Sequence, residues 1–186
     1  MSRSYIAGDC RPVIRVFLVV VLLLVVPLGA AGEDTVPFHS SFTGEFSLRF
    51  GAGPDGIDDL LFTGPGRARH MGKSTVAGHS TTLPDPTEPG CSDIVTDWVI
   101  LTAANGDQLW LVNSGEDCLD FTIPNRLFIR GTGTFTVAGG TGRFAGATGS
   151  GDFKVDADVL SFDDDGGGVS GSFALSFTGQ ISRPHR

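Results

Sequence analysis

Charged residues are few in this chain, and Lys and Glu are especially scarce. Asp, Glu, Lys and Arg make up 18% of the sequence, against about 25% in an ordinary soluble protein. The scarcity of Lys and Glu excludes a coiled coil, and so much Phe, Val and Leu with so little charge excludes a disordered chain. The 27 glycines show no three-residue period, which excludes a collagen-like helix. After residue 31 no segment has a sustained helical period, so a β protein is expected.

The motifs of the common catalytic and metal sites are also missing. The sequence has no His-x-x-x-His or Cys-x-x-Cys pair for zinc and no Gly-x-Ser-x-Gly nucleophile elbow. Residues 66–74 imitate a phosphate-binding loop, but five residues rather than four separate the two glycines. Residues 163–165 are three aspartates without the spacing of a calcium loop, and they are predicted to form a solvated hairpin tip. We therefore expect no metal and no cofactor.

The first 31 residues have the pattern of a secretory signal peptide. Three arginines precede an unbroken apolar run at 16–26, and small residues lead to the acidic pair Glu33-Asp34. The run is shorter than the roughly 20 residues that a membrane span needs. The pattern predicts cleavage after Ala31, a mature domain at 32–186, and a secreted, periplasmic or cell-envelope location; an uncleaved N-terminal anchor is the alternative.

Two cysteines, Cys91 and Cys118, follow the predicted signal peptide. An even pair in an exported chain favours a disulfide, and two free buried thiols are the alternative. The net charge of −8 becomes more negative when the arginine-rich leader is removed. Such a surface repels phosphate backbones, so no nucleic-acid partner is expected, nor a stable membrane span after cleavage.

Period-two alternation is the main signal in the rest of the chain. Four segments place apolar residues on one face and polar residues on the other: 42–50, 127–137, 153–159 and 173–181. Segments 94–102 and 109–112 are apolar on both faces, so they are predicted to be covered on both sides or to contact a partner. Turn residues separate the segments, with Asn105-Gly106 predicted to form a two-residue hairpin. The pattern predicts an all-β fold: a single closed antiparallel barrel of about eight strands.

Residues 139–151 (GGTGRFAGATGSG) are the most distinctive stretch of the chain, and Phe144 within it is predicted to plug the core. The stretch resembles the glycine-rich turn of the allene oxide cyclase and dirigent barrels. Together with residues 70–73 (HMGK) and 102–107 (TAANGD), it resembles even more closely a group of small exported bacterial proteins placed near that superfamily. The resemblance implies an eight-stranded barrel that is often oligomeric and that can hold a hydrophobic molecule. It carries no catalytic residue over to this chain, and catalytic residues are unknown.

Three residues are candidates for ligand binding: His70, Asp97 and Trp98. If residues 67–76 form a strand, the face with Arg67, Arg69 and Met71 is wet and His70 points into the barrel. Asp97 shares a face with Val95, Val99 and Leu101, and Trp98 lies on the opposite face. A satisfied core histidine is the alternative for His70, and an Asp97–His70 acid–base couple is the functional one.

Three functions fit these observations. The first is a non-catalytic exported barrel that binds an apolar small molecule or serves as an envelope or surface module. The second is a cofactor-independent isomerase or cyclase that acts on a hydrophobic substrate inside the barrel. The third is a structural or adhesive homo-oligomer that uses the two-sided apolar strand at 94–102.

Overall fold

The alternating segments form eight long strands. The structure, a computed structural model, describes residues 34–52 and 57–184. The predicted signal peptide lies outside these residues. The strands are β1 (Thr35–Arg49), β2 (Asp58–Ala68), β3 (Gly72–Pro84), β4 (Cys91–Ala103), β5 (Gln108–Asp120), β6 (Phe128–Gly140), β7 (Gly149–Phe162) and β8 (Gly168–Ser182).

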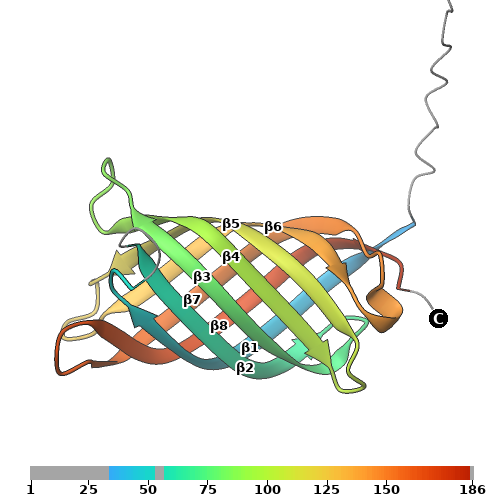
Figure 1. Cartoon of the computed structure of the whole chain (residues 1–186), viewed down its shortest axis with the longest axis horizontal. Coiled ribbons are helices and arrows are strands. Elements are labelled where there is room, and N and C mark those ends of the chain that lie inside the picture. Colours follow the sequence, from blue (N-terminus) through green and yellow to red (C-terminus); the bar gives the residue numbers. More distant parts are fainter. Residues whose placement is uncertain (1–33, 53–56, 185–186) are drawn as a thin grey trace, which may run out of the picture. The chain divides into compact units, whose positions relative to one another are not determined.

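Every strand pairs antiparallel with the next, and β8 pairs with β1 along its whole length (Figure 1). Closure leaves no free sheet edge. The predicted closed antiparallel barrel is therefore confirmed. We call the end formed by the loops after β1, β3, β5 and β7 the mouth. We call the opposite end, which holds the turns after β2, β4 and β6, the closed end.

Phenylalanine and glycine fill the barrel together. Five inward-facing phenylalanine rings each lie over a glycine directly opposite on the neighbouring strand, where a Cβ atom would overlap the ring. The pairs are Phe42 with Gly66, Phe62 with Gly78, Phe153 with Gly133, Phe135 with Gly151, and Phe46 with Gly171. This arrangement accounts for five of the 14 Phe and five of the 27 Gly in the sequence.

The closed end is sealed by a short 3-10 turn, η2 (Gly142–Phe144). Phe144 is fully buried there, as predicted. Arg143 turns outward, and its Nε donates to Asp107 Oδ2 at 2.9 Å in the β4–β5 turn. The β4–β5 turn itself differs from the prediction, because Ala103 and Asp107 close a three-residue loop in which only Gly106 has a positive φ.

The predicted strand at 67–76 is wrong in its middle. Residues 69–71 form a tight turn between β2 and β3, with His70 at φ 68° and Gly72 at φ 75°. The turn reverses the alternation, so Met71 is buried in the core while Arg67 and Arg69 stay exposed. Gly72, which tolerates the positive φ, is the residue that allows this turn.

Candidate functional site

The barrel interior holds a chamber of about 50 Å³ on the mouth side of the core. Its wall is mostly apolar. The aliphatic and aromatic lining residues are Phe46, Leu60, Phe62, Ile94, Ile129, Phe153, Val155, Ala157, Phe173 and Leu175. Since one ordered water needs roughly 10–15 Å³ measured in this way, the chamber has room for a small chemical group.

Four polar side chains complete the lining, and they come from three adjacent strands. Ser80 lies on β3, Asp97 on β4, and Asn113 and Asp117 on β5. Ser80 and Asp97 are opposite each other in the sheet, and Asn113 Nδ2 donates to Asp97 Oδ2 at 2.7 Å. The structure therefore brings these four side chains into one polar cluster inside an apolar barrel.

A bulge in β4 sets the position of Asp97. The register between β3 and β4 shifts by one residue, so that Thr81 faces Thr96 and Thr82 faces Ile94. The bulge lets both Ile94 and Asp97 line the chamber while Val95 turns out to solvent with 53% of its surface exposed. The prediction that Val95 shares the face of Asp97 is thus wrong. Bulges commonly re-aim a side chain in this way near functional sites.

A glycine makes room for Asp117. Its partner across β6 is Gly131, and a Cβ atom at that position would overlap Asp117 Oδ1. The pair repeats the phenylalanine–glycine arrangement with a carboxyl group in place of a ring. The absence of a side chain at Gly131 thus leaves the space that the carboxyl group of Asp117 occupies.

The carboxyl groups of the cluster are poorly solvated. Burial raises the pKa of Asp97 to about 6, against the opposing effects of the Asn113 hydrogen bond and of His79. Burial also raises the pKa of Asp117 to about 6, and the charge of Asp97 adds to this effect. The two carboxyl groups therefore change protonation state near pH 6 rather than near pH 4.

One oxygen on each of the four side chains has no hydrogen-bond partner among the residues that the structure describes. These atoms are Ser80 Oγ, Asp97 Oδ1, Asn113 Oδ1 and Asp117 Oδ1. A buried polar atom left in this state costs roughly 1–3 kcal/mol. Their convergence on one chamber marks this region as the candidate site.

The chamber leads to the mouth. A second hollow of about 250 Å³ lies there, which we call the vestibule, and Leu60, Asp117 and Ile129 line both spaces. The vestibule wall otherwise contains Leu48, Phe50, Asp58, Thr82, Pro84, Gly90, Cys91, Ser92 and Leu119. A molecule in the chamber would therefore extend outward along a mainly apolar path.

The predicted disulfide is present and lies at this mouth. Cys91 and Cys118 face each other across β4 and β5 with an S–S distance of 2.07 Å. Asp117 precedes Cys118 directly in the chain. The bond thus ties the start of β4 to the strand that carries two of the four polar residues.

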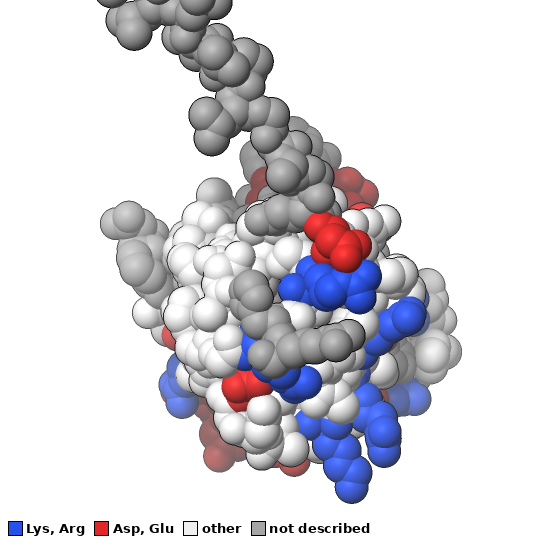
Figure 2. Space-filling model, turned by 90° about the vertical axis from the view of Figure 1, so that its right-hand side faces the viewer, with Lys and Arg blue, Asp and Glu red and all other residues white. Residues whose placement is uncertain are grey.

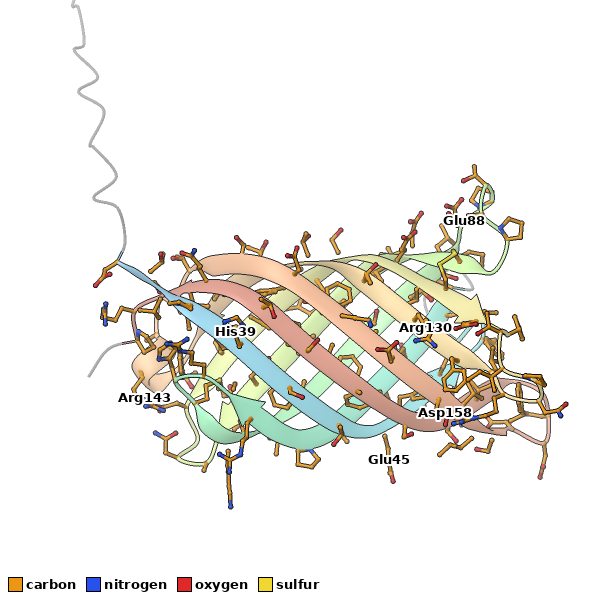
Figure 3. The ribbon with its side chains drawn as sticks, turned by 180° about the vertical axis from the view of Figure 1, so that it is seen from behind. His39, Glu45, Glu88, Arg130, Arg143 and Asp158 are labelled. Atoms are coloured by element: carbon orange, nitrogen blue, oxygen red, sulfur yellow. A yellow bond between two sulfur atoms is a disulfide. The ribbon has the colours of Figure 1, made fainter. Side chains whose placement is uncertain are left out.

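Acidic residues outnumber basic ones at the mouth, where Arg49 ends β1 and two further arginines are bound to carboxylates. Arg130 binds Asp120 and Asp156 on the outer surface, each at 2.5 Å, and Arg126 binds Asp158. Arg130 and Asp158 lie at the opposite end of the barrel from Arg143 (Figure 3). Lys and Arg side chains instead gather at the closed end (Figure 2), where Arg67, Arg69 and Lys73 belong to the β2–β3 hairpin.

Of the predicted ligand-binding residues, only Asp97 lines the chamber. His70 lies in the β2–β3 turn at the closed end, where its Nε2 is 3.1 Å from the Pro37 carbonyl oxygen. Trp98 lies on the outer face of β4 with 56% of its surface exposed. The structure therefore does not bring His70 together with Asp97, and the expected inward position of His70 is wrong because a turn replaces the strand.

The sequence prediction missed Ser80, Asn113 and Asp117. A signal for Asn113 was available, because it continues the inward-facing series Leu109 and Leu111 as the only polar member. Asp117 continues the same face two steps further along β5. No comparable signal marked Ser80.

Among residues 34–52 and 57–184, no group of three or more His, Cys, Asp and Glu side chains could hold a metal ion. In the same part of the chain no helix is long and apolar enough to cross a membrane.

No family model and no curated protein matches the sequence. Two solved structures are similar to the chain, and both are described as pterocarpan synthase dirigent proteins. One is 13% identical, with a TM-score of 0.41, over 86% of this chain and 95% of that one. The other is 14% identical, with a TM-score of 0.42, over 83% of this chain and 98% of that one.

Proposed function

We propose that the protein is a small-molecule-binding barrel whose ligand places a polar group in the chamber and an apolar part in the vestibule. The observation that carries the proposal is the set of four buried oxygen atoms that have no partner in the described part of the chain. A ligand that bonds to them offsets a cost that the folded chain otherwise bears. The apolar lining contributes affinity because ligand binding removes apolar surface from contact with water.

The site of action that we propose is outside the cytoplasm. The Cys91–Cys118 disulfide is stable in oxidising compartments and rare in reducing ones. The signal-peptide pattern in the first 31 residues supports the same location.

Native mass spectrometry of the protein purified from its own source tests the binding function. We expect the folded protein to carry a bound molecule of low mass. Ala157 lines the chamber, so Ala157→Leu should fill it and abolish the adduct. Ala77 is exposed on β3, so Ala77→Leu is the matched control and should retain the adduct. A wild-type protein with only the mass of its chain would contradict the proposal.

A second candidate function is acid–base catalysis, as in a cofactor-independent isomerase or cyclase. It is favoured by two carboxyl groups whose pKa values are raised to about 6 in an apolar chamber. Such groups donate and accept protons near neutral pH. The distinguishing measurement is chemical change of the bound molecule recovered after incubation with the wild-type protein and with Asp97→Asn.

The third candidate, a structural or adhesive oligomer, is favoured by the outer face of β4. Trp98 and Ile100 are 56% and 40% exposed there. The described residues therefore cover the inner face of β4 but leave apolar side chains uncovered on its outer face. Sedimentation at high concentration tests it. A strictly monomeric species would remove this candidate without affecting the binding function.

A further inference from the structure

We propose that the ligand is an amphiphile with a protonated amine, which enters head-first so that Asp97 and Asp117 hold the ammonium group and the vestibule holds the tail. This inference rests on the proposed binding function and specifies its ligand class. It follows from the donor and acceptor balance of the chamber, from the absence of a counter-charge and from the charge of the mouth.

The polar cluster is rich in acceptors and poor in donors. An ionised carboxylate only accepts hydrogen bonds, so Asp97 Oδ1 and Asp117 Oδ1 both require donors. Asn113 gives one of its two amide hydrogens to Asp97, and its carbonyl oxygen is a third acceptor. The Ser80 hydroxyl and the second amide hydrogen of Asn113 are the donors that the cluster itself supplies, so acceptors still outnumber donors. An ammonium group offers three donors from one atom and thus matches this set.

No protein cation neutralises the two carboxyl groups. Among the described residues, no Lys, Arg or His lines the chamber or the vestibule. The nearest candidate, His79 on β3, hydrogen-bonds to Asp59 of β2, and Arg130 is bound to carboxylates on the outer surface. A buried charge is normally paired, so a cationic ligand supplies what the chain does not.

The shape and the aromatic lining fit a small cation followed by an apolar tail. The chamber of about 50 Å³ is walled in part by Phe46, Phe62, Phe153 and Phe173, and ring faces attract ammonium groups. The larger vestibule presents Leu48, Phe50 and Leu119 to whatever follows the head.

The mouth has the charge that such a ligand requires. Asp58 lines the vestibule itself, and Asp85 and Glu88 lie on the loop after β3. Residues 163–165, three aspartates, follow β7 at the same end, where Arg49 at the end of β1 is the opposing charge. Figure 3 shows Glu88 on the loop that projects beyond this end. A ring of negative charge raises the local concentration of cations and speeds their entry, whereas it repels anions.

Calorimetric titration of the full chain with three six-carbon probes tests the inference. The probes are 1-aminohexane, 1-hexanol and hexanoate, which share a tail and differ in the head. At pH 7.5 we expect the amine to bind at least about tenfold more tightly than the alcohol, and hexanoate to show no binding. Asp97→Asn and Asp117→Asn should each weaken amine binding by about tenfold or more and alter alcohol binding by less than about threefold.

Asp152→Asn is the matched control, because it removes a carboxylate from the exposed outer face of β7 without touching the chamber. It should leave both affinities unchanged. Circular dichroism of each variant establishes that the barrel is folded.

Protons compete with the amine for the same oxygens. The titratable groups near the chamber are Asp97 and Asp117 themselves, His79 from β3 and Asp58 from β2; Asp117 is faced on β6 by Gly131. Lowering the pH from 7 to 5 should therefore weaken amine binding by about tenfold and change alcohol binding much less.

The outcomes separate the two proposals. Equal affinity for the alcohol and the amine would overturn the amine inference and leave the binding barrel intact. Amine binding that survives both chamber variants, or that falls equally in Asp152→Asn, would also overturn the inference, because the attraction would then be non-specific. Failure of all three probes, together with a wild-type protein free of any adduct, would overturn the binding function as well.

Discussion

The two ends of the barrel are built from the same alternating strands but are filled differently. Towards the closed end the interior is packed with fully buried phenylalanines such as Phe38, Phe135, Phe144 and Phe177. Towards the mouth the same inward positions carry Ser80, Asp97, Asn113 and Asp117 around a chamber. The difference shows that the alternating strand pattern determines the barrel, whereas a few inward-facing residues determine whether its interior is packed or contains a cavity.

The largest expected effect is the loss of stability when a phenylalanine is removed from the packed closed end rather than from the wall of the chamber. Phe135→Ala should lower the free energy of unfolding by about 4 kcal/mol, because the ring is 1% exposed and packs edge-on against Phe38 and Phe177. Phe62→Ala should cost about half as much, since that ring already borders the chamber. Urea unfolding with the disulfide intact measures both, and equal losses would erase the distinction between the two ends.

Removing the disulfide should weaken the mouth more than the closed end. The paired variant Cys91→Ser with Cys118→Ser opens a loop with a sequence separation of 27 residues, which lowers the free energy of unfolding of the whole barrel by about 3.5 kcal/mol in the chain-entropy account. Hydrogen exchange should accelerate further in the mouth ends of β4 and β5 than in η2 and its neighbours. Uniform acceleration would mean that the two ends unfold as one unit.

Asp97→Asn should change how the free energy of unfolding depends on pH, which tests the buried carboxyl group near the mouth. Because the pKa of Asp97 is raised from 3.8 to about 6, the folded state retains a proton that the unfolded chain loses between these values. The free energy of unfolding of the wild-type protein therefore falls as the pH rises through this window, and the stability that is present below about pH 4 is lost above about pH 6.

The asparagine variant lacks this loss. It should be more stable than the wild type by about 2 to 3 kcal/mol at pH 7 and nearly equal to it at pH 4. Thermal unfolding across this range provides the measurement. A constant difference at every pH would show that the carboxyl group of Asp97 is not the titrating group.

The smallest effect separates the inside of the barrel from the outside. Trp98→Ser removes an exposed side chain from the outer face of β4, so stability should change by less than about 0.5 kcal/mol. Binding of the six-carbon probes should be unchanged in the same titration. Weaker binding would bring Trp98 back as part of the site.

Most of the barrel was predictable from the sequence. Alternation such as that at 42–50 and 173–181 identifies strands. Short strands with frequent turns, about eight in a chain of this length, favour a closed barrel, which removes exposed sheet edges. The disulfide was predictable from an even cysteine pair. The turn at His70 was not, because a mixed run of small and basic residues also fits a strand, and only Gly72 pointed to a reversal.

The polar residues that line the chamber were harder to predict than the barrel itself. Asp97 was identified, but the bulge that places it beside Ile94 adds one residue to β4 without any change in composition. Asp117 joins it only through the register between β4 and β5 and through Gly131 across the sheet. Which inward positions of different strands meet depends on the register of the closed sheet, and no single segment encodes that register.

The phenylalanine–glycine pairs imply that the two residues of a pair change together in evolution. At Gly78 the three atoms nearest to an added Cβ all belong to the Phe62 ring, so Gly78→Ala alone would displace that ring, and Phe62→Gly alone would leave a hole. Exchanging both residues should let the ring reach the same space from the opposite strand. Related sequences are therefore expected to gain, lose or swap the two members together, and such paired changes would reveal the strand register without a structure.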